Sequence, residues 1–133
     1  MKFKSSFCDP FNPKIIDLGQ IEKSKVMETF ETIPWTEHLN KMKDANQSAI
    51  HYSPSLEFEN TMNNNGLVIS AVDGIEWYIF FKRPKWRRKF FGLINSYDEN
   101  FVSDITGQSI EDVRICLKAL IDNNLNLLEE KIK

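Results

Sequence analysis

The chain has 133 residues, the length of one ordinary domain, and we predict a single domain over residues 1–133. Hydrophobic residues make up 41% and charged residues 27% of the sequence, a globular composition that excludes extensive disorder. The net charge of −2 at pH 7 disfavours a protein that binds nucleic acid through its overall charge.

The first part of the chain predicts a loosely structured N-terminal segment followed by a helical region. Two prolines interrupt the first twenty residues, which indicate a loosely structured segment with a short strand at Lys14–Leu18. From Ser24 onward, apolar residues recur at helical spacing, and the stripe continues to Met42. Because the first turn of a helix tolerates proline, Pro34 predicts either two short helices or one kinked helix, ending near residues 44–48.

The middle of the chain alternates apolar and polar residues with the period of a strand. We predict strands over Leu56–Met62, Leu67–Val72 and Ile75–Phe81. The residues Asn63-Asn64-Asn65-Gly66 tolerate positive φ, and Asp73-Gly74 is typical of a two-residue type I′ turn. These two turns predict an antiparallel meander.

A two-residue turn at Asp73-Gly74 also predicts the face on which each side chain lies. It pairs Ala71 with Glu76 and Ile69 with Tyr78. One face of the sheet then carries a large apolar set together with two acids, namely Val68, Val72, Ile75, Trp77, Ile79, Phe81, Glu57 and Glu59. Because the other face is also partly apolar, we expect helices on one side and the N-terminal segment or a partner on the other.

A helix is predicted near the C-terminus. Ser109 is a favourable N-cap, acidic residues occupy the first turn, and an apolar stripe continues to Ile121. Asn123-Asn124 is expected to interrupt the helix, and a second short helix or an extension follows. The predicted fold class is α+β, with an antiparallel β-meander of three to four strands flanked by N-terminal and C-terminal helices.

The cysteines and the N-terminus indicate the cellular compartment. Cys8 and Cys116 lie far apart without a C-x-x-C pair, which argues against a disulfide framework, a zinc site or a dithiol redox motif. No apolar run resembles a signal peptide or approaches the roughly eighteen residues of a membrane span. We therefore expect a cytoplasmic protein with no membrane partner.

Motifs that carry catalysis are absent from the sequence. The five glycines form neither a phosphate-binding loop nor a dinucleotide fingerprint, and no zinc-protease or serine-hydrolase motif occurs. His38 and His51 lack an accompanying nucleophile or metal-ligand spacing, and Cys116 lies on an apolar helix stripe. Glu57 and Glu59 are more typical of a solvated strand than of a catalytic pair. We expect no enzyme, no cofactor and no metal.

One segment concentrates positive charge. Six of the 17 basic residues lie within Lys82–Lys89, interleaved with Trp86, and without them 11 basic residues face 19 acidic ones, a balance of −8. This pattern permits binding to nucleic-acid phosphates with Trp86 as a stacking platform. We favour the alternative, a solvated loop at a strand end whose charges pair with acids elsewhere, and regard nucleic acid as the secondary hypothesis.

Two stretches carry a family resemblance. The run Gly66–Lys85, containing Val-Asp-Gly-Ile-Glu-Trp-Tyr-Ile-Phe-Phe, and the run Asp104–Arg114, which opens a helix, resemble the small cytoplasmic immunity proteins of bacterial contact-dependent growth inhibition and related polymorphic-toxin systems. The resemblance implies a protein that binds its cognate toxin domain, often a nuclease. Binding would block the active site or its access to substrate.

Acidic side chains around an aromatic centre are the candidate partner-binding surface. Strand parity places Glu57, Glu59 and Asp73 on or beside the face of Trp77, with two further acids in the loop before the last helix. The candidates are Glu57, Glu59, Asp73, Trp77, Asp98 and Glu99. An acidic surface suits a basic nuclease, although Trp77 in the core and solvated acids would fit the same pattern. The sequence does not determine the oligomeric state.

Overall fold

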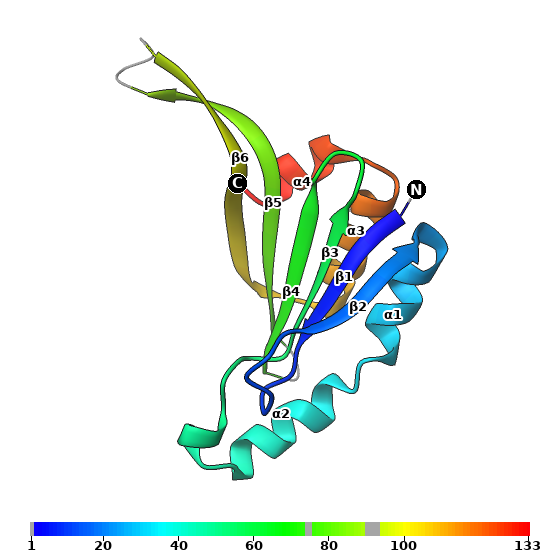
Figure 1. Ribbon diagram of the computed structural model, residues 1–133, viewed down its shortest axis with the longest axis vertical. Coiled ribbons are helices and arrows are strands. Elements are labelled where there is room, and N and C mark those ends of the chain that lie inside the picture. Colours follow the sequence, from blue (N-terminus) through cyan, green and yellow to red (C-terminus); the bar gives the residue numbers. More distant parts are fainter. Residues whose placement is uncertain (1, 74–75, 90–93) are drawn as a thin grey trace.

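The computed structural model describes residues 2–73, 76–89 and 94–133. Within these ranges six strands form one antiparallel sheet in the order β2-β1-β3-β4-β5-β6, accompanied by four α-helices (Figure 1). The strands are β1 (Lys2–Cys8), β2 (Ile16–Glu22), β3 (Ser55–Asn60), β4 (Gly66–Asp73), β5 (Glu76–Lys89) and β6 (Ile94–Gln108). The helices are α1 (Val26–Thr32), α2 (Trp35–Asp44), α3 (Ile110–Ile121) and α4 (Leu125–Lys131).

The α+β class and the β3-β4-β5 meander are confirmed, but the predicted number of strands is wrong. The N-terminal segment, which was expected to be loosely structured, begins with strand β1. Its residues alternate between buried and exposed, and it pairs with both β2 and β3. The short strand predicted at residues 14–18 is β2, which begins and ends later. The last strand, β6, was not predicted, because a polar edge strand contains little hydrophobic alternation.

Local signals define the helices as the sequence predicts. Pro34 separates α1 from α2, so the apolar stripe forms two helices. The Ser109 side chain accepts a hydrogen bond from the Asp112 backbone N–H, and Asp112 bonds back to the Ser109 backbone, which completes a capping box for α3. Asn123 has a φ of 55°, and Asn124 caps α4, so the two asparagines do interrupt the C-terminal helical segment.

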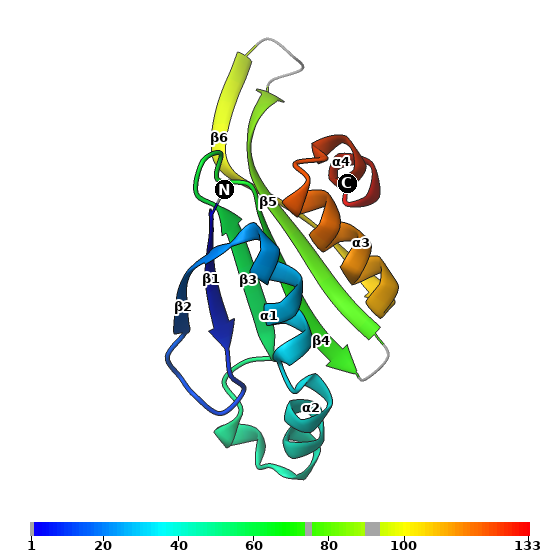
Figure 2. The same cartoon turned by 90° about the vertical axis from the view of Figure 1, so that its right-hand side faces the viewer.

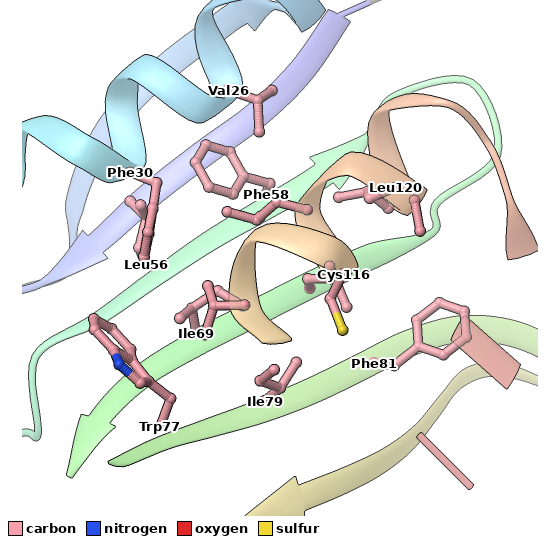
Figure 3. Close-up of a cluster of buried hydrophobic side chains, with 14 of the residues drawn as sticks. Val26, Phe30, Leu56, Phe58, Ile69, Trp77, Ile79, Phe81, Cys116 and Leu120 are labelled. Carbon is pink, nitrogen blue, oxygen red and sulfur yellow. The ribbon is translucent and has the colours of Figure 1, made fainter. Parts of the chain in front are cut away.

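The core lies between the sheet and the helices, which gather on one face (Figure 2). Every second residue of the central strands points inward, among them Phe58, Ile69 and Ile79. Helix α3 contributes Leu117 and Cys116, which are both fully buried. Figure 3 shows Cys116 on the side of α3 that faces these strands. The meander therefore buries one face, and its alternation has the period expected of a sheet that is covered on one side only.

An aromatic cluster centred on Trp77 closes one end of the core. The Trp77 ring packs edge to face on Trp35 of α2, with ring centroids 5.0 Å apart, and lies 5.5 Å from the Phe30 ring of α1. The Trp35 indole N–H donates a hydrogen bond to the Phe30 carbonyl over 3.1 Å. Helices α1 and α2 are thus held to the sheet through β5.

The register between β4 and β5 differs by one residue from the prediction. Ala71 pairs with Trp77 instead of Glu76, because an irregularity between Ala71 and Asp73 inserts Val72 into β4. Gly74 of the predicted turn lies outside the described residues. As side chains alternate along a strand, this shift moves Trp77 to the helix-covered face and leaves Glu57 and Glu59 on the other.

Both edges of the sheet are interrupted at a glycine. Gly19 in β2 has a φ of 77° and Gly107 in β6 a φ of 65°, and each lies where the pairing register shifts. Residues with a Cβ rarely adopt this conformation. Bulged edges disfavour pairing with the edge of another sheet.

We predict that Leu117→Ala destabilises the protein by about 2–5 kcal/mol, because a fully buried side chain leaves a cavity against the sheet. The free energy of unfolding is measured in urea. Ile115→Ala on the same helix is the control, since Ile115 is 47% exposed and its replacement should change stability by less than about 0.5 kcal/mol. Equal effects of the two substitutions would contradict this packing of α3.

Candidate functional site

The face of the sheet opposite the helices bears a mixed set of side chains. Cross-strand pairing aligns them in rows that run from β1 to β5 or β6. The rows contain Lys4, Glu59, Gly66, Lys82 and Val102, then Ser6, Glu57, Val68, Phe80 and Asp104, and finally Cys8, Ser55, Ser70 and Tyr78. Among the described residues no helix packs on this outer face.

Two aromatic residues lie at the centre of the outer face. The rings of Tyr78 and Phe80 are stacked, with centroids 4.7 Å apart and planes only 4° from parallel, and both side chains are partly exposed. A hydrogen bond to the Asp104 side chain raises the pKa of Tyr78, and partial burial adds to this effect. A rigid aromatic pair beside a carboxylate is the kind of surface that proteins use as a contact anchor.

A hollow beside this pair is lined by charged side chains. Lys82 lies between Glu57 and Glu59, with Nζ to carboxylate distances of 3.6 and 3.2 Å. The hollow has a volume of about 310 Å³ and extends to Lys4 and Asp17 on β1 and β2. Three acidic and two basic side chains therefore surround it.

A second hollow adjoins the first at Glu59. It has a volume of about 360 Å³ and is lined on the β6 side by Tyr97, Glu99 and Asn100, and on β5 by Pro84. We call the two hollows together the trough. Its charged side chains are the acids Asp17, Glu57, Glu59 and Glu99 and the bases Lys4 and Lys82. The trough thus carries a net negative charge.

Beyond the trough, β5 and β6 continue as a two-stranded ribbon that projects past the other strands (Figure 1). The last residue of β5 that pairs with β4 is Lys82, whereas pairing with β6 extends to Lys89. We call residues 84–89 and 94–100 the arm, of which Pro84, Tyr97, Glu99 and Asn100 also line the trough. The basic segment Lys82–Lys89 was predicted as a loop at a strand end, and this is wrong, because cross-strand hydrogen bonding continues through it.

A buried arginine fixes the root of the arm. Arg83 is only 4% exposed, and its guanidinium donates two hydrogen bonds of 2.8 Å to the Glu129 carboxylate of α4. It also donates to the Ser103 hydroxyl over 2.6 Å, and that hydroxyl donates to the Ile132 carbonyl over 2.7 Å. The group lies over the ring of Phe101 at 4.5 Å. These bonds hold β5, β6 and the C-terminal segment together.

The basic residues at the root are therefore already paired with acids. Lys82 binds two glutamates of β3, and Arg83 and Lys85 share Glu129. This agrees with the preferred interpretation of the segment, in which its charges pair with acids elsewhere. The backbone of Arg87 and Arg88 lies farther along the arm, opposite Ser96 and Asn95.

Three of the six predicted site residues meet in the trough, namely Glu57, Glu59 and Glu99. Asp98 was expected in a loop with Glu99, but both are in β6, and Asp98 pairs in register with Lys85. Trp77 was expected on the face of the acids; it is 4% exposed and belongs to the core, because of the register shift.

The remaining predicted residue, Asp73, pairs in register with Glu76 at the end of β4. Sequence reasoning missed Tyr78 and Phe80 as the exposed aromatic residues, although their alternation with Trp77 was visible. It also missed Asp17 and Lys4, since β1 was not recognised as a strand. Correct strand parity would have identified the aromatic pair.

Two of the side chains that were weighed as catalytic groups, Cys116 and His38, pack against other residues. Burial raises the pKa of the Cys116 thiol to about 11, which opposes formation of a thiolate. His38 packs its ring against Phe7 at 5.4 Å. In the part of the chain that is described, no three histidine, cysteine or carboxylate side chains are grouped to hold a metal ion. The described helices also include none long and apolar enough to span a membrane.

Comparison with known proteins returned no relative. The chain matches no family model, no curated protein and no solved structure.

We predict that Glu129→Gln destabilises the protein by about 1–2 kcal/mol at pH 7, since it weakens charged hydrogen bonds to buried Arg83. Partial exposure of Glu129 keeps the effect below that of a fully buried pair. Hydrogen bonding to Arg83 lowers the pKa of Glu129.

The pH dependence follows from this direction. The stabilisation is present above the ordinary glutamate pKa of about 4.3 and is lost as the pH falls through the lower folded-state value. Urea unfolding at a series of pH values should show the wild type and Glu129→Gln converging in acid. The control is Glu130→Gln, an exposed neighbour, and a pH-independent difference for Glu129→Gln would contradict the pairing.

Proposed function

We propose that this chain is a toxin-neutralising immunity protein, which binds a cognate toxin domain, a basic nuclease domain, and blocks its activity. The resemblance of Gly66–Lys85 and Asp104–Arg114 to immunity proteins of polymorphic-toxin systems motivates this proposal. The first stretch spans β4 and much of β5, which carry the outer face. The second spans the end of β6 and the start of α3.

The observation that carries the proposal is an acidic trough beside an exposed aromatic pair on an uncovered sheet face. Four carboxylates and two ammonium groups line the trough, and the stacked Tyr78 and Phe80 lie next to it. Nucleases bind phosphates with basic surfaces, so charge complementarity favours association with this face. Aromatic anchors supply the apolar contact that such interfaces concentrate at their centre.

Neutralisation in this proposal needs no chemical step. Glu57 and Glu59 project from one strand face and both contact Lys82. A guanidinium of the toxin would enter beside Lys82 and donate hydrogen bonds to the two carboxylates, in place of substrate phosphates. The toxin's basic surface would then be covered while its fold remains intact. Such a protein acts in the cytoplasm, where the toxin meets its substrate.

Co-expression with the toxin domain encoded by a neighbouring gene tests the function. Cells that produce the wild-type protein should survive, and Glu57→Lys/Glu59→Lys should lose protection because two like charges then face the basic toxin. Interfacial charge reversal of this kind costs several kcal/mol. Binding of the purified proteins is measured by calorimetry.

The matched control is Asp44→Lys/Glu130→Lys, which reverses two exposed acids on the helices α2 and α4 and should protect like the wild type. Circular dichroism establishes that both variants are folded. Full protection by Glu57→Lys/Glu59→Lys would rule out the trough, and the absence of any toxin that this protein neutralises would rule out the function.

A second candidate, nucleic-acid binding through the arm, is favoured by one observation. The basic run from Lys85 to Lys89 lies on a projecting ribbon, and ribbons of this form can enter a nucleic-acid groove. Against it, Lys82 and Lys85 are already paired with acids. Acidic side chains also line the adjoining trough, where they would repel phosphates.

We therefore predict no tight binding of DNA or RNA oligonucleotides at physiological salt, as measured by fluorescence anisotropy. If all six basic residues contacted duplex phosphates, the logarithmic salt slope would be about −5. Replacing Arg87 and Arg88 would then reduce the slope by about two. Tight binding with that salt dependence would favour the second candidate over the first.

A further inference from the structure

The two ends of the stacked pair of Tyr78 and Phe80 have different neighbours. Lys82 follows Phe80 by two residues on the outer face of β5, where the two glutamates of the trough hold it. Glu76 precedes Tyr78 by two residues, so the alternation of side chains along β5 places Glu76 on the outer face as well. The Phe80 end of the stack therefore adjoins a cation, whereas the Tyr78 end adjoins a carboxylate.

A second carboxylate reaches the Tyr78 end from β6. Asp104 pairs in register with Phe80 and accepts a hydrogen bond from the Tyr78 hydroxyl. Because a carboxylate offers about four lone-pair sites, this bond leaves Asp104 able to accept further donors. Glu76 and Asp104 are both exposed, and among the described residues neither forms an ion pair with a lysine or arginine. Two uncompensated carboxylates thus flank one end of an exposed aromatic stack.

The chain binds one guanidinium of its own with this combination of groups. The Arg83 guanidinium lies over the rings of Phe81 and Phe101, at 4.3 and 4.5 Å from their centroids. It also donates two hydrogen bonds of 2.8 Å to the Glu129 carboxylate. The planar cation of arginine suits such a site, because it stacks on an aromatic ring while its N–H groups donate to carboxylates at the side. The Tyr78 end offers the same groups on the outer face.

We propose that the Tyr78 end of the stack binds an arginine side chain of a protein partner, and we call it the arginine site. The guanidinium extends the stack beyond the Tyr78 ring and donates hydrogen bonds to the carboxylates of Glu76 and Asp104. Lysine fits less well, because its ammonium group is a compact charge without a plane that could stack. Phosphates and other anions are repelled by the two carboxylates.

This inference rests on the proposed function, because both take the outer face of the sheet as the surface that meets a protein partner. It adds a second point of contact and names the residue type that the partner places there. The arginine site lies about 13 Å along β5 from Lys82 in the trough, at roughly 3.3 Å per residue. A partner that fills both points presents two basic side chains at about this spacing, as a basic nuclease surface can.

An NMR titration of the isotope-labelled protein with the capped tripeptide Gly-Arg-Gly tests the arginine site without a toxin. The amide signals of Glu76, Tyr78 and Asp104 should shift and saturate at peptide concentrations on the order of millimolar, because exposed ion pairs and one cation–π contact bind weakly. The same tripeptide with lysine or citrulline in place of arginine should bind at least about fivefold more weakly. Equal binding of the lysine peptide would overturn the proposal, as would shifts confined to the trough.

Substitutions then locate the binding. Glu76→Gln/Asp104→Asn removes both charges at nearly constant side-chain size and should raise the dissociation constant of the arginine peptide at least about fivefold. Tyr78→Ala removes the ring on which the guanidinium stacks and should weaken binding to a similar extent. The matched control is Glu28→Gln/Glu130→Gln, which neutralises two exposed acids on α1 and α4 and should bind like the wild type. The dispersion of the amide signals establishes that each variant is folded, and undiminished binding by folded Glu76→Gln/Asp104→Asn would overturn the proposal.

The outcomes for the arginine site and for the proposed function are separable, because the peptide titration requires no toxin and co-expression requires no peptide. Binding of the arginine peptide at Tyr78 by a protein that neutralises no toxin would support the arginine site and contradict only the function. Neutralisation of a toxin by a protein that does not bind the peptide at Tyr78 would support the function and overturn the arginine site.

Discussion

Pairing between β4 and β5 is the constraint on which the rest of the structure depends. Ala71 opposite Trp77 sends the indole into the helix layer, where Trp35 and Phe30 pack around it. The next residue along, Tyr78, must then face outward. Because side chains alternate with a period of two, a shift of one residue would expose the whole inner set. The insertion at Val72 therefore determines both the core and the composition of the outer face.

Arg83 connects the sheet to the C-terminal segment. A guanidinium that is 4% exposed is costly to bury, and here its donors reach Glu129, Ser103 and the Phe81 carbonyl. The first residues of the positive segment are thus part of the folded domain through ion pairs, whereas the backbone of the later ones continues along the ribbon of β5 and β6.

Charge is unevenly distributed over a chain whose net charge is only −2. Four acids and two bases line the trough, which therefore suits a basic partner. An immunity protein would use the trough to cover a toxin. The proposed function places Glu57 and Glu59 at the point of contact, next to the stacked pair of Tyr78 and Phe80.

The sequence by itself determined the features that depend on neighbouring residues. Ser109 with Asp112 encodes the start of α3, Pro34 separates two helices, and the asparagines at 123 and 124 end a third, because caps and breakers act within one turn of backbone. The meander, together with the acids Glu57 and Glu59 that it carries, was also predictable, because turn residues and the alternation along a strand are local patterns.

Tertiary structure alone decided what depends on partners distant in the chain. Strand β1 is defined by its pairing with β3, about fifty residues away, and the arm by where β4 stops and β6 continues. The burial of Trp77 and Arg83 follows from a bulge and from a helix at the far end of the sequence. Strand register is a long-range property, since a single inserted residue reverses every face while the local pattern of apolar residues stays the same.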